Sequence, residues 1–240
     1  MKAPRLHLPH YVAHHRERAQ LPIEEVVNVA THAAGLLFSI AGLVMLLVWT
    51  AQNNGDALHF VSLSIYGATL ILVFLASTLY HSATYHSIAS FSAAGARLRS
   101  AFEAFDHTAI FLLIAGTYTP FALVGLGGGW GWSLFGVIWG LAVFGIVFRL
   151  VRRRHDRWIV VPIYLVMGWM GIVAVGEIAS AISVAGLFWL LLGGVIYSAG
   201  VAFYAWERLR FNHAIWHVFV LAGSFCHFLA TVLIAVPPVA

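Results

Sequence analysis

The sequence predicts an all-α integral membrane protein built as a bundle of seven transmembrane helices. Hydrophobic residues make up 61% of the 240 residues and charged residues only 9%, whereas a soluble domain is roughly 25% charged. Long stretches also contain no Asp, Glu, Lys or Arg, and several exceed the ~20 apolar residues that one spanning helix needs. These stretches are 57–96, 107–148, 178–206 and 211–240.

The first four helices follow from the breaks that separate them. The helix 25–50 ends at the polar segment TAQNNGD, and the helix 57–81 ends at a serine-rich segment, 82–100. The helix 104–125 ends at GLGGGWG, which we interpret as a turn. The helix 131–151 ends in the basic segment RLVRRRHDR.

The last three helices are predicted at 157–180, 184–206 and 213–236. A weak break, SAIS, separates the first two, and the charged segment ERLRFN precedes the last. Pro120 and Pro162 are expected to kink the third and fifth helices, because proline removes a backbone hydrogen bond.

The basic residues predict the domain organisation and the orientation. Residues 1–24 form a basic, histidine-rich N-terminal tail, and residues 25–240 form the seven-helix domain. All thirteen Lys and Arg residues precede an odd-numbered helix or follow an even-numbered one. Because cytoplasmic loops are enriched in Lys and Arg, we expect a cytoplasmic N-terminus and an outside C-terminus. The net charge of +4 then reflects these loops, and no nucleic-acid partner is expected.

Two absences narrow the chemistry. The first 24 residues contain no apolar core of the kind found in a cleaved signal peptide, so the first helix is expected to be the insertion signal. Cys226 is the only cysteine, which excludes an intramolecular disulfide and a cysteine-based zinc or redox motif. Any metal site must therefore use histidine and carboxylate ligands.

Polar residues of four helices are predicted to meet at one depth. Odd-numbered helices begin at the cytoplasmic surface and even-numbered helices end there, so these groups should converge. Ionisable residues in spanning helices are costly, by about 2.5–3.5 kcal/mol at mid-helix, and face the bundle interior or water. The alternative is that each is an interfacial residue in contact with water and headgroups. The residues concerned are Glu25, Asn28, His32, Ser77, His81, Asp106, His213 and His217.

Three of these histidines predict a metal site. Two imidazoles four residues apart on one helix, His213 and His217, can reach one ion, and His81 of another helix can complete a three-histidine set. Zinc is the expected ion, and three protein ligands with one open position are typical of catalytic zinc. Asp106 can orient or deprotonate a water there, and Ser77 can donate a hydrogen bond to a developing oxyanion.

The neighbouring polar residues have supporting or structural interpretations. Glu25 can hydrogen-bond a ligand histidine, and Asn28 and His32 can support the site from the first helix; capping or loop contacts are equally open. His107 points about 100° away from Asp106 around the helix and is expected to pack. His227 lies roughly 15 Å deeper than His217 and is expected to make a buried hydrogen bond.

The order of these motifs resembles the bacterial haemolysin III branch of the progestin and adipoQ receptor family. The motifs are ExxNxxxH at 25–32, SxxxH at 77–81, Asp106 within FDHTAIFLLIAGTYTP, and HxxxH at 213–217. The resemblance covers nearly the whole chain after the N-terminal tail, and the superfamily includes alkaline ceramidases. It implies a zinc ion held at His81, His213 and His217, with a water between the metal and Asp106.

The resemblance and the residues together lead to two functional hypotheses. The first is a membrane-embedded zinc hydrolase of a lipid amide or ester, acting on membrane lipids at the cytoplasmic side of a bacterial inner membrane. The second is a non-enzymatic receptor, sensor or channel-like protein affecting membrane homeostasis, in which a structural zinc ties two helices together.

Overall fold

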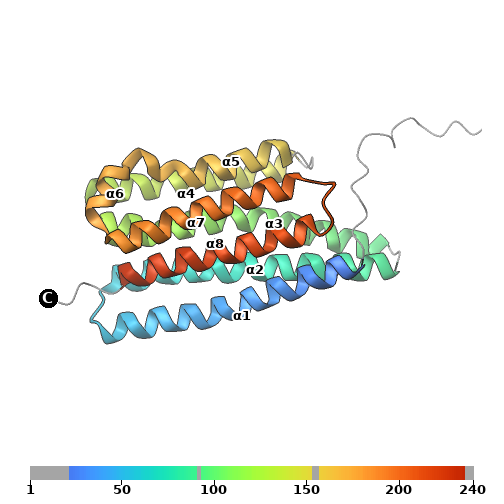
Figure 1. Ribbon diagram of the computed structural model, residues 1–240, viewed down its shortest axis with the longest axis horizontal. Helices are drawn as coiled ribbons and strands as arrows, with labels where there is room; N and C mark the ends of the chain where they lie inside the picture. Colours follow the sequence, from blue (N-terminus) through green and yellow to red (C-terminus); the bar gives the residue numbers. More distant parts are fainter. Residues whose placement is uncertain (1–21, 91–92, 153–156, 236–240) are drawn as a thin grey trace, which may run out of the picture.

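The computed structural model describes residues 22–90, 93–152 and 157–235, and these ranges contain helices and no strand (Figure 1). Seven helical segments in the described ranges are long and apolar enough to cross a membrane. The predicted all-α, seven-span bundle is confirmed, and the chain is a multi-pass membrane protein. Its helices are α1 (Pro22–Gln52), α2 (Ala57–Ser90), α3 (Ala93–Pro120), α4 (Gly128–Arg152), α5 (Arg157–Trp169), α6 (Val175–Ala181), α7 (Val184–Ala205) and α8 (Asn212–Ala235).

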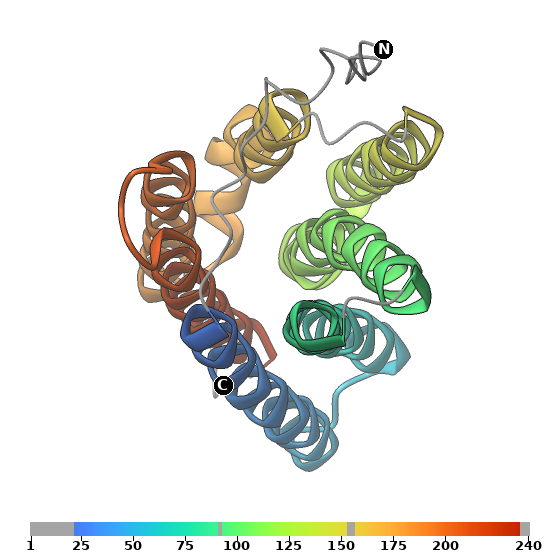
Figure 2. The ribbon, with the colours of Figure 1, turned by 90° about the vertical axis from the view of Figure 1, so that its right-hand side faces the viewer.

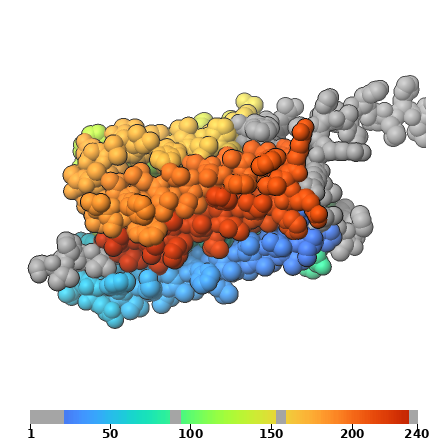
Figure 3. Space-filling view, viewed as in Figure 1, coloured from blue at the N-terminus to red at the C-terminus, as the bar shows by residue number. Residues whose placement is uncertain are grey.

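The spanning helices form a ring. Seen along the bundle, the chain passes from α1 through α2, α3, α4, α5 and α7 to α8, which returns to lie beside α1 (Figure 2). On the face shown in Figure 3, α1, α8 and α7 lie side by side. The first and last spans are therefore neighbours.

One end of the bundle carries every arginine of the described ranges, and we call it the basic end. It is the end at which α1 begins and α8 begins, on the right in Figure 1. This separation fits the predicted orientation, which stays a prediction. The predicted tail lies outside the described residues up to residue 21, and α1 already begins at Pro22. The arginines are Arg97, Arg99, Arg149, Arg152, Arg157, Arg208 and Arg210.

The second and third spans are separated within the predicted break at 82–100, but the predicted extent of the break is wrong, because most of this segment is helical. The helix α2 continues to Ser90 and α3 begins at Ala93. The segment holds as many alanines as serines, and serine is at most ~0.7 kcal/mol worse than alanine in a helix. The Thr84 hydroxyl also donates to the Tyr80 carbonyl, 2.9 Å away. Serine-rich composition alone does not end a helix.

Two spans contain irregular turns near their middle or far end. At Pro120 the α-helix α3 gives way to a π-helical turn, Phe121–Leu126, which ends at Gly127 with a positive φ of 61°. The break predicted at GLGGGWG is confirmed there. In the fifth span, regular helix continues past Pro162, and a 3₁₀ turn, Met170–Ala174, follows and leads into α6.

The threonines of the spans satisfy their hydroxyls locally, with one exception. All nine threonines lie in the described ranges, and eight donate to the carbonyl three or four residues earlier. This back-bonding is the ordinary way to satisfy a hydroxyl inside a membrane helix. Thr117 makes no such bond, although it is only 7% exposed.

Candidate metal centre

The polar residues predicted to converge do so at the basic end of the bundle. The first turns of α1, the later part of α2, the first half of α3 and the first turns of α8 each contribute side chains. Most of these side chains are buried; Asp106 and His213 are half-buried. Four helices thus place a polar cluster inside a bundle whose other lining is largely apolar.

Three imidazoles form the centre of this cluster. One ring nitrogen from each of His81, His213 and His217 lies within 4.8 Å of the others. The ring centroids of His81 lie 5.0 Å from His213 and 4.8 Å from His217, and the two α8 rings are 4.5 Å apart. His81 and His217 are 1% and 2% exposed. His213 and His217 are four residues apart and lie on one face of α8, and His81 reaches the same point from α2.

The nitrogens that face this centre have no protein partner. His81 Nε2, His213 Nε2 and His217 Nδ1 are buried and lack a hydrogen bond within the described part of the chain. A buried polar atom left unpartnered costs about 1–3 kcal/mol, so three together need an explanation. A single cation would satisfy all three, because neutral imidazole nitrogen is a common metal ligand. The residues present therefore fit a metal ion.

Glu25 of α1 hydrogen-bonds the His81 ring, and Asn28 of the same helix lies beside it. Glu25 Oε2 lies 2.8 Å from His81 Nδ1, and both side chains are 1% exposed. The Asn28 amide nitrogen is 3.4 Å from the same ring nitrogen. A carboxylate accepts, so Nδ1 carries the proton and Nε2 keeps its lone pair for the centre. This is the usual arrangement behind a metal-binding histidine.

Ser77 and Asp106 stand together beside the three imidazoles. The Ser77 hydroxyl hydrogen-bonds the Asp106 carboxylate, and Ser77 is 1% exposed. Asp106 is not part of the three-histidine ligand group. His107, next along α3, turns away to the Glu103 carbonyl at 2.7 Å, and its own carbonyl accepts from Tyr164 at 2.7 Å. The expected packing role of His107 agrees with these contacts.

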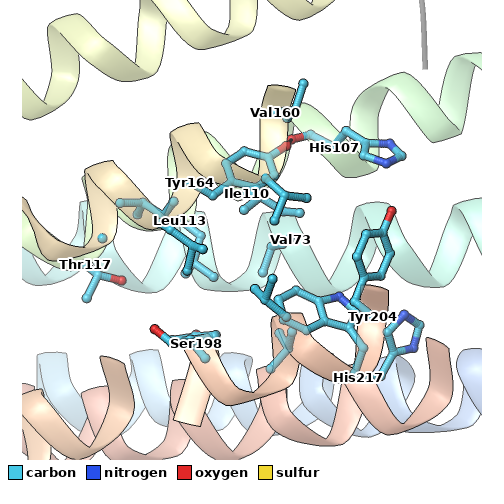
Figure 4. A pocket seen from close by; sticks show the side chains of 18 of the residues that line it. Val73, His107, Ile110, Leu113, Thr117, Val160, Tyr164, Ser198, Tyr204 and His217 are labelled. Atoms are coloured by element: carbon cyan, nitrogen blue, oxygen red, sulfur yellow. Dashed lines mark hydrogen bonds between the residues drawn. The ribbon is translucent and has the colours of Figure 1, made fainter. Parts of the chain in front are cut away.

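A cavity of about 160 Å³ extends from this cluster and is lined by residues of α1, α2, α3, α5, α7 and α8. His32, Ser77, Asp106, His213 and His217 line one end of it. Apolar side chains such as Val73, Ile110 and Leu113 line the middle, and Figure 4 shows His217 and Thr117 toward opposite ends. The polar centre thus opens into a space suited to hydrocarbon.

Comparison with known proteins identifies the family. A sequence model described as "Haemolysin-III related" matches residues 21–228. The chain belongs to this family. It is 42% identical over 201 residues to a hemolysin-3 homolog of Bacillus subtilis, covering 84% of this chain and 89% of that protein. It is 40% identical over 214 residues to hemolysin-3 of Bacillus cereus, covering 89% and 93%. The predicted haemolysin III resemblance is confirmed.

A human relative extends the comparison beyond bacteria. Monocyte to macrophage differentiation factor of Homo sapiens is 29% identical over 215 residues, covering 86% of this chain and 82% of that protein. All three alignments span most of this haemolysin-III-related chain, and the residues matched by the family model, 21–228, include the histidine cluster.

His32 lies against the cluster in a way that its spacing does not predict. Its ring centroid is 3.8 Å from that of His217 and 5.3 Å from Phe74. Both of its ring nitrogens are buried without a hydrogen bond to the described residues. In this haemolysin III family member, His32 therefore supports His217 by ring contact rather than by donating to it.

The loop before α8 is held from α1. Glu24 Oε1 accepts a hydrogen bond from the Phe211 backbone nitrogen at 3.2 Å, and Phe211 has a positive φ of 57°. A non-glycine residue in this region is uncommon and often marks a constrained site. The sequence analysis did not predict a role for Glu24 or for Tyr204, whose ring lies 5.8 Å from His213. The only feature of the sequence that could have indicated Glu24 is its position next to Glu25. Tyr204 is separated from His213 by a loop, so no helical spacing relates the two residues.

Proposed function

We propose that this chain is a membrane-embedded, zinc-dependent hydrolase that cleaves an amide or ester bond of a membrane lipid. One observation carries the proposal: one ring nitrogen from each of three imidazoles lies within 4.8 Å of the others at the head of an apolar cavity, and each of these rings has a buried nitrogen without a partner among the described residues. The hydrogen-bonded pair Ser77 and Asp106 lines the same end of that cavity.

The donor set favours zinc with a catalytic role. His81, His213 and His217 would hold the ion, and three protein ligands are typical of catalytic zinc, whereas structural zinc usually takes four. Zinc supplies Lewis acidity and lowers the pKa of a bound water from 15.7 to about 7. Glu25 keeps the proton of His81 on Nδ1, which leaves Nε2 available.

Asp106 is the proposed proton carrier. As the water oxygen bonds to the carbonyl carbon of the substrate, the Asp106 carboxylate accepts the water proton. When the C–N or C–O bond breaks, Asp106 returns this proton to the departing amine or alcohol. The products are a fatty acid and the free amine or alcohol, and Asp106 is again a carboxylate.

Ser77 is the proposed partner of the substrate carbonyl. Its single O–H donates to Asp106 while that carboxylate is charged. Once Asp106 holds a proton, it can donate to Ser77 Oγ, which has two lone pairs. The Ser77 O–H is then free to donate to the carbonyl oxygen as its negative charge grows.

The cavity supports a lipid as the substrate. Its middle is lined by valine, leucine and isoleucine side chains, and two candidate metal ligands, His213 and His217, lie with Asp106 at one end. An acyl chain would occupy the apolar part while its carbonyl lies at Ser77. With the predicted orientation, the site would lie at the cytoplasmic leaflet of the cell membrane. In a bacterium with two membranes, the cell membrane is the inner one.

Metal analysis and lipid turnover of purified variants test the proposal. We expect a single zinc ion per chain in the wild type and loss of zinc in His217→Ala. Asp106→Asn should keep its zinc while hydrolysis of a long-chain N-acyl amide falls by about 10²–10⁴-fold. His59→Ala, at the opposite end of the bundle, is the matched histidine control and should match the wild type in both measurements.

Two outcomes would contradict the hydrolase. One is a wild-type protein that binds no divalent metal when purified without chelators. The other is turnover that survives Asp106→Asn unchanged.

The names of the Bacillus relatives favour a second candidate, a membrane-permeabilising protein in which the metal only ties α2 to α8. Dye release from liposomes separates the two. A permeabilising protein releases dye with Asp106→Asn as well as with the wild type, whereas the hydrolase releases none.

A further inference from the structure

A second cavity of about 80 Å³ continues beyond the first, toward the end of the bundle opposite the basic end. It is lined by apolar residues of the π-helical turn, the 3₁₀ turn, α6 and α7, including Phe121, Ile172 and Ile178. Six residues line both cavities, and we call them the neck. The neck consists of Thr117, Tyr118, Gly168, Trp169, Gly194 and His227.

Two polar side chains of the neck are fully engaged with the protein. The Tyr118 hydroxyl donates to the Gly168 carbonyl at 2.7 Å and accepts from the Gly171 backbone nitrogen at 2.8 Å. The Trp169 indole nitrogen donates to Ser198 Oγ at 2.9 Å. Neither group has a donor left for a ligand.

Thr117 and His227 differ from these two. Thr117 is the one threonine of the chain that does not donate to a carbonyl of its own helix. His227 Nε2 lies 3.1 Å from the Leu190 carbonyl and must donate to it, so Nδ1 is left as an acceptor. Neither the Thr117 hydroxyl nor His227 Nδ1 has a hydrogen-bond partner in the ranges that the structure describes. The predicted buried hydrogen bond of His227 is confirmed, but it uses only half of the ring.

The free groups are complementary to one kind of ligand atom. A hydroxyl can donate to His227 Nδ1 and accept from the Thr117 hydroxyl at the same time. A carbonyl or ether oxygen only accepts, so it would leave His227 Nδ1 unsatisfied. A hydrocarbon would leave both groups unsatisfied. We propose that the neck is a binding subsite for a hydroxyl group carried on the chain of the lipid, a proposal that rests on the lipid-binding role argued above.

The depth of the neck fixes where along the chain this hydroxyl lies. His227 is ten residues beyond His217 on α8, which is roughly 15 Å along the helix axis. A saturated chain advances by less than one C–C bond length, ~1.5 Å, per carbon. The hydroxyl therefore lies about ten to twelve carbons from the carboxyl carbon held at the histidine cluster. The remaining chain would continue into the second cavity.

The backbone around the neck is shaped to expose these groups. Thr117 lies one turn before Pro120, where α3 changes to the π-helical turn, a feature frequently found at functional sites. On α7, Gly193 makes room for the His227 ring: a Cβ at this position would lie 2.5 Å from His227 Nε2. The absence of a side chain at Gly193 lets the imidazole reach the neck.

Fatty-acid binding to the full-length, metal-loaded protein in detergent tests the subsite without requiring turnover. The probes are octadecanoic acid and its analogue with one hydroxyl about twelve carbons from the carboxylate. The wild type should bind the hydroxylated acid roughly five- to tenfold more tightly, as one net hydrogen bond allows. Thr117→Val and His227→Phe should each bring the ratio of the two dissociation constants close to one.

Two further variants are controls for the loss of the Thr117 hydroxyl. Thr117→Ser keeps the hydroxyl and should keep the preference. Thr50→Val removes another buried threonine hydroxyl, which donates to the Leu46 carbonyl, and should also keep the preference. Affinity for octadecanoic acid itself reports whether each variant is folded.

The binding and hydrolysis measurements distinguish failure of the hydroxyl subsite from failure of the hydrolase. Equal wild-type affinity for the two acids would overturn the subsite, as would a preference that survives Thr117→Val. Hydrolysis of the two corresponding amides is measured separately. A preference in binding with no hydrolysis would leave the subsite standing and remove the hydrolase.

Discussion

The contact between Glu25 and His81 is the residue-scale feature on which the proposed metal centre depends most directly. An imidazole has two nitrogens, and only the one without a proton can bind a metal. At 2.8 Å from Nδ1, with both groups buried, the Glu25 carboxylate settles this choice for His81. The carboxylate also adds a negative charge close to the proposed cation.

Glu25→Gln tests this contact. The amide keeps the size of the side chain but removes the charge and allows the wrong tautomer of His81. Metal affinity should fall by about 10–100-fold, measured by competition with a chelator of known affinity. Glu177→Gln, on α6 at the far end of the bundle, is the control and should leave affinity unchanged. Unchanged affinity in Glu25→Gln would mean that the carboxylate does not tune the site.

At this scale, sequence reasoning found the residues but not all of their contacts. The helical spacing of Glu25, Asn28 and His32 places them on one stripe of α1, so their joint arrival at His81 and His217 was predictable. The ring nitrogen that each side chain would contact was not predictable, because it depends on the rotation and depth of α1 against α2 and α8. His32 accordingly packs on His217 instead of hydrogen-bonding it.

Among the elements, α2 begins with a capping residue outside the membrane-spanning segment. Asp56 Oδ1 accepts from the His59 ring at 2.7 Å and from the His59 backbone nitrogen at 2.9 Å. These hydrogen bonds hold the pKa of the Asp56 carboxyl below its usual 3.8. A lowered folded-state pKa means that the stabilisation is present above 3.8 and is lost as pH falls through the folded value.

The melting temperatures of the wild type and Asp56→Ala should therefore differ at neutral pH and converge below pH 3.8. The comparison between the two proteins removes the contribution of other carboxylates. A difference that stays constant across this range would show that the charge of Asp56 does not stabilise the start of α2.

The packing of α7 against α8 depends on small residues, and Gly193 is the clearest example. Alanine there would place its Cβ 3.1 Å from the Gly223 carbonyl oxygen as well as against the His227 ring. Gly193→Ala should destabilise the protein by about 1–3 kcal/mol and lower its melting temperature in detergent.

Gly140→Ala on α4 is the matched control for Gly193→Ala, because nothing lies within 4 Å of its Cβ position. It should stabilise by about 0.5–1 kcal/mol, the usual cost of glycine in a helix. Equal melting temperatures for the two variants would contradict close helix packing at Gly193.

Element boundaries were predictable where the chain needs a special backbone conformation, and less so elsewhere. Gly127 and Gly128 both have positive φ, and the glycine-rich segment that contains them was predicted as a turn. The π-helical turn after Pro120 and the 3₁₀ turn at Met170–Ala174 were not predicted in form. A proline in the sequence indicates that one backbone hydrogen bond is lost. The backbone conformation that follows depends on the packing of neighbouring helices.

For the whole molecule, the separation of charge along the bundle is the basis for orientation in the membrane. Every arginine of the described ranges lies at the basic end. The predicted orientation places this end, with the histidine cluster, in the cytoplasm.

Labelling of single cysteines in intact cells tests the orientation. In a Cys226→Ser background, Gly129→Cys lies exposed at the end opposite the basic end, and Trp206→Cys lies exposed at the basic end. A membrane-impermeant maleimide should label Gly129→Cys in intact cells and Trp206→Cys only after lysis. The reverse pattern would place the histidine cluster outside.

The seven-span architecture was predictable as a whole because each span is decided by local composition. In a bilayer a long apolar segment must form a helix to satisfy its backbone, whatever its neighbours are. The cavity was not predictable, because its lining comes from six helices, α1, α2, α3, α5, α7 and α8, and their arrangement around it follows only from the packed ring.

The division of the three histidines between α2 and α8 also has a consequence for biosynthesis. His81 leaves the ribosome early and can already be hydrogen-bonded by Glu25, whereas His213 and His217 emerge only with the final span. A nascent or prematurely terminated chain therefore has no complete metal centre. The proposed hydrolysis would therefore be impossible until translation has finished and the last helix has closed the ring beside the first.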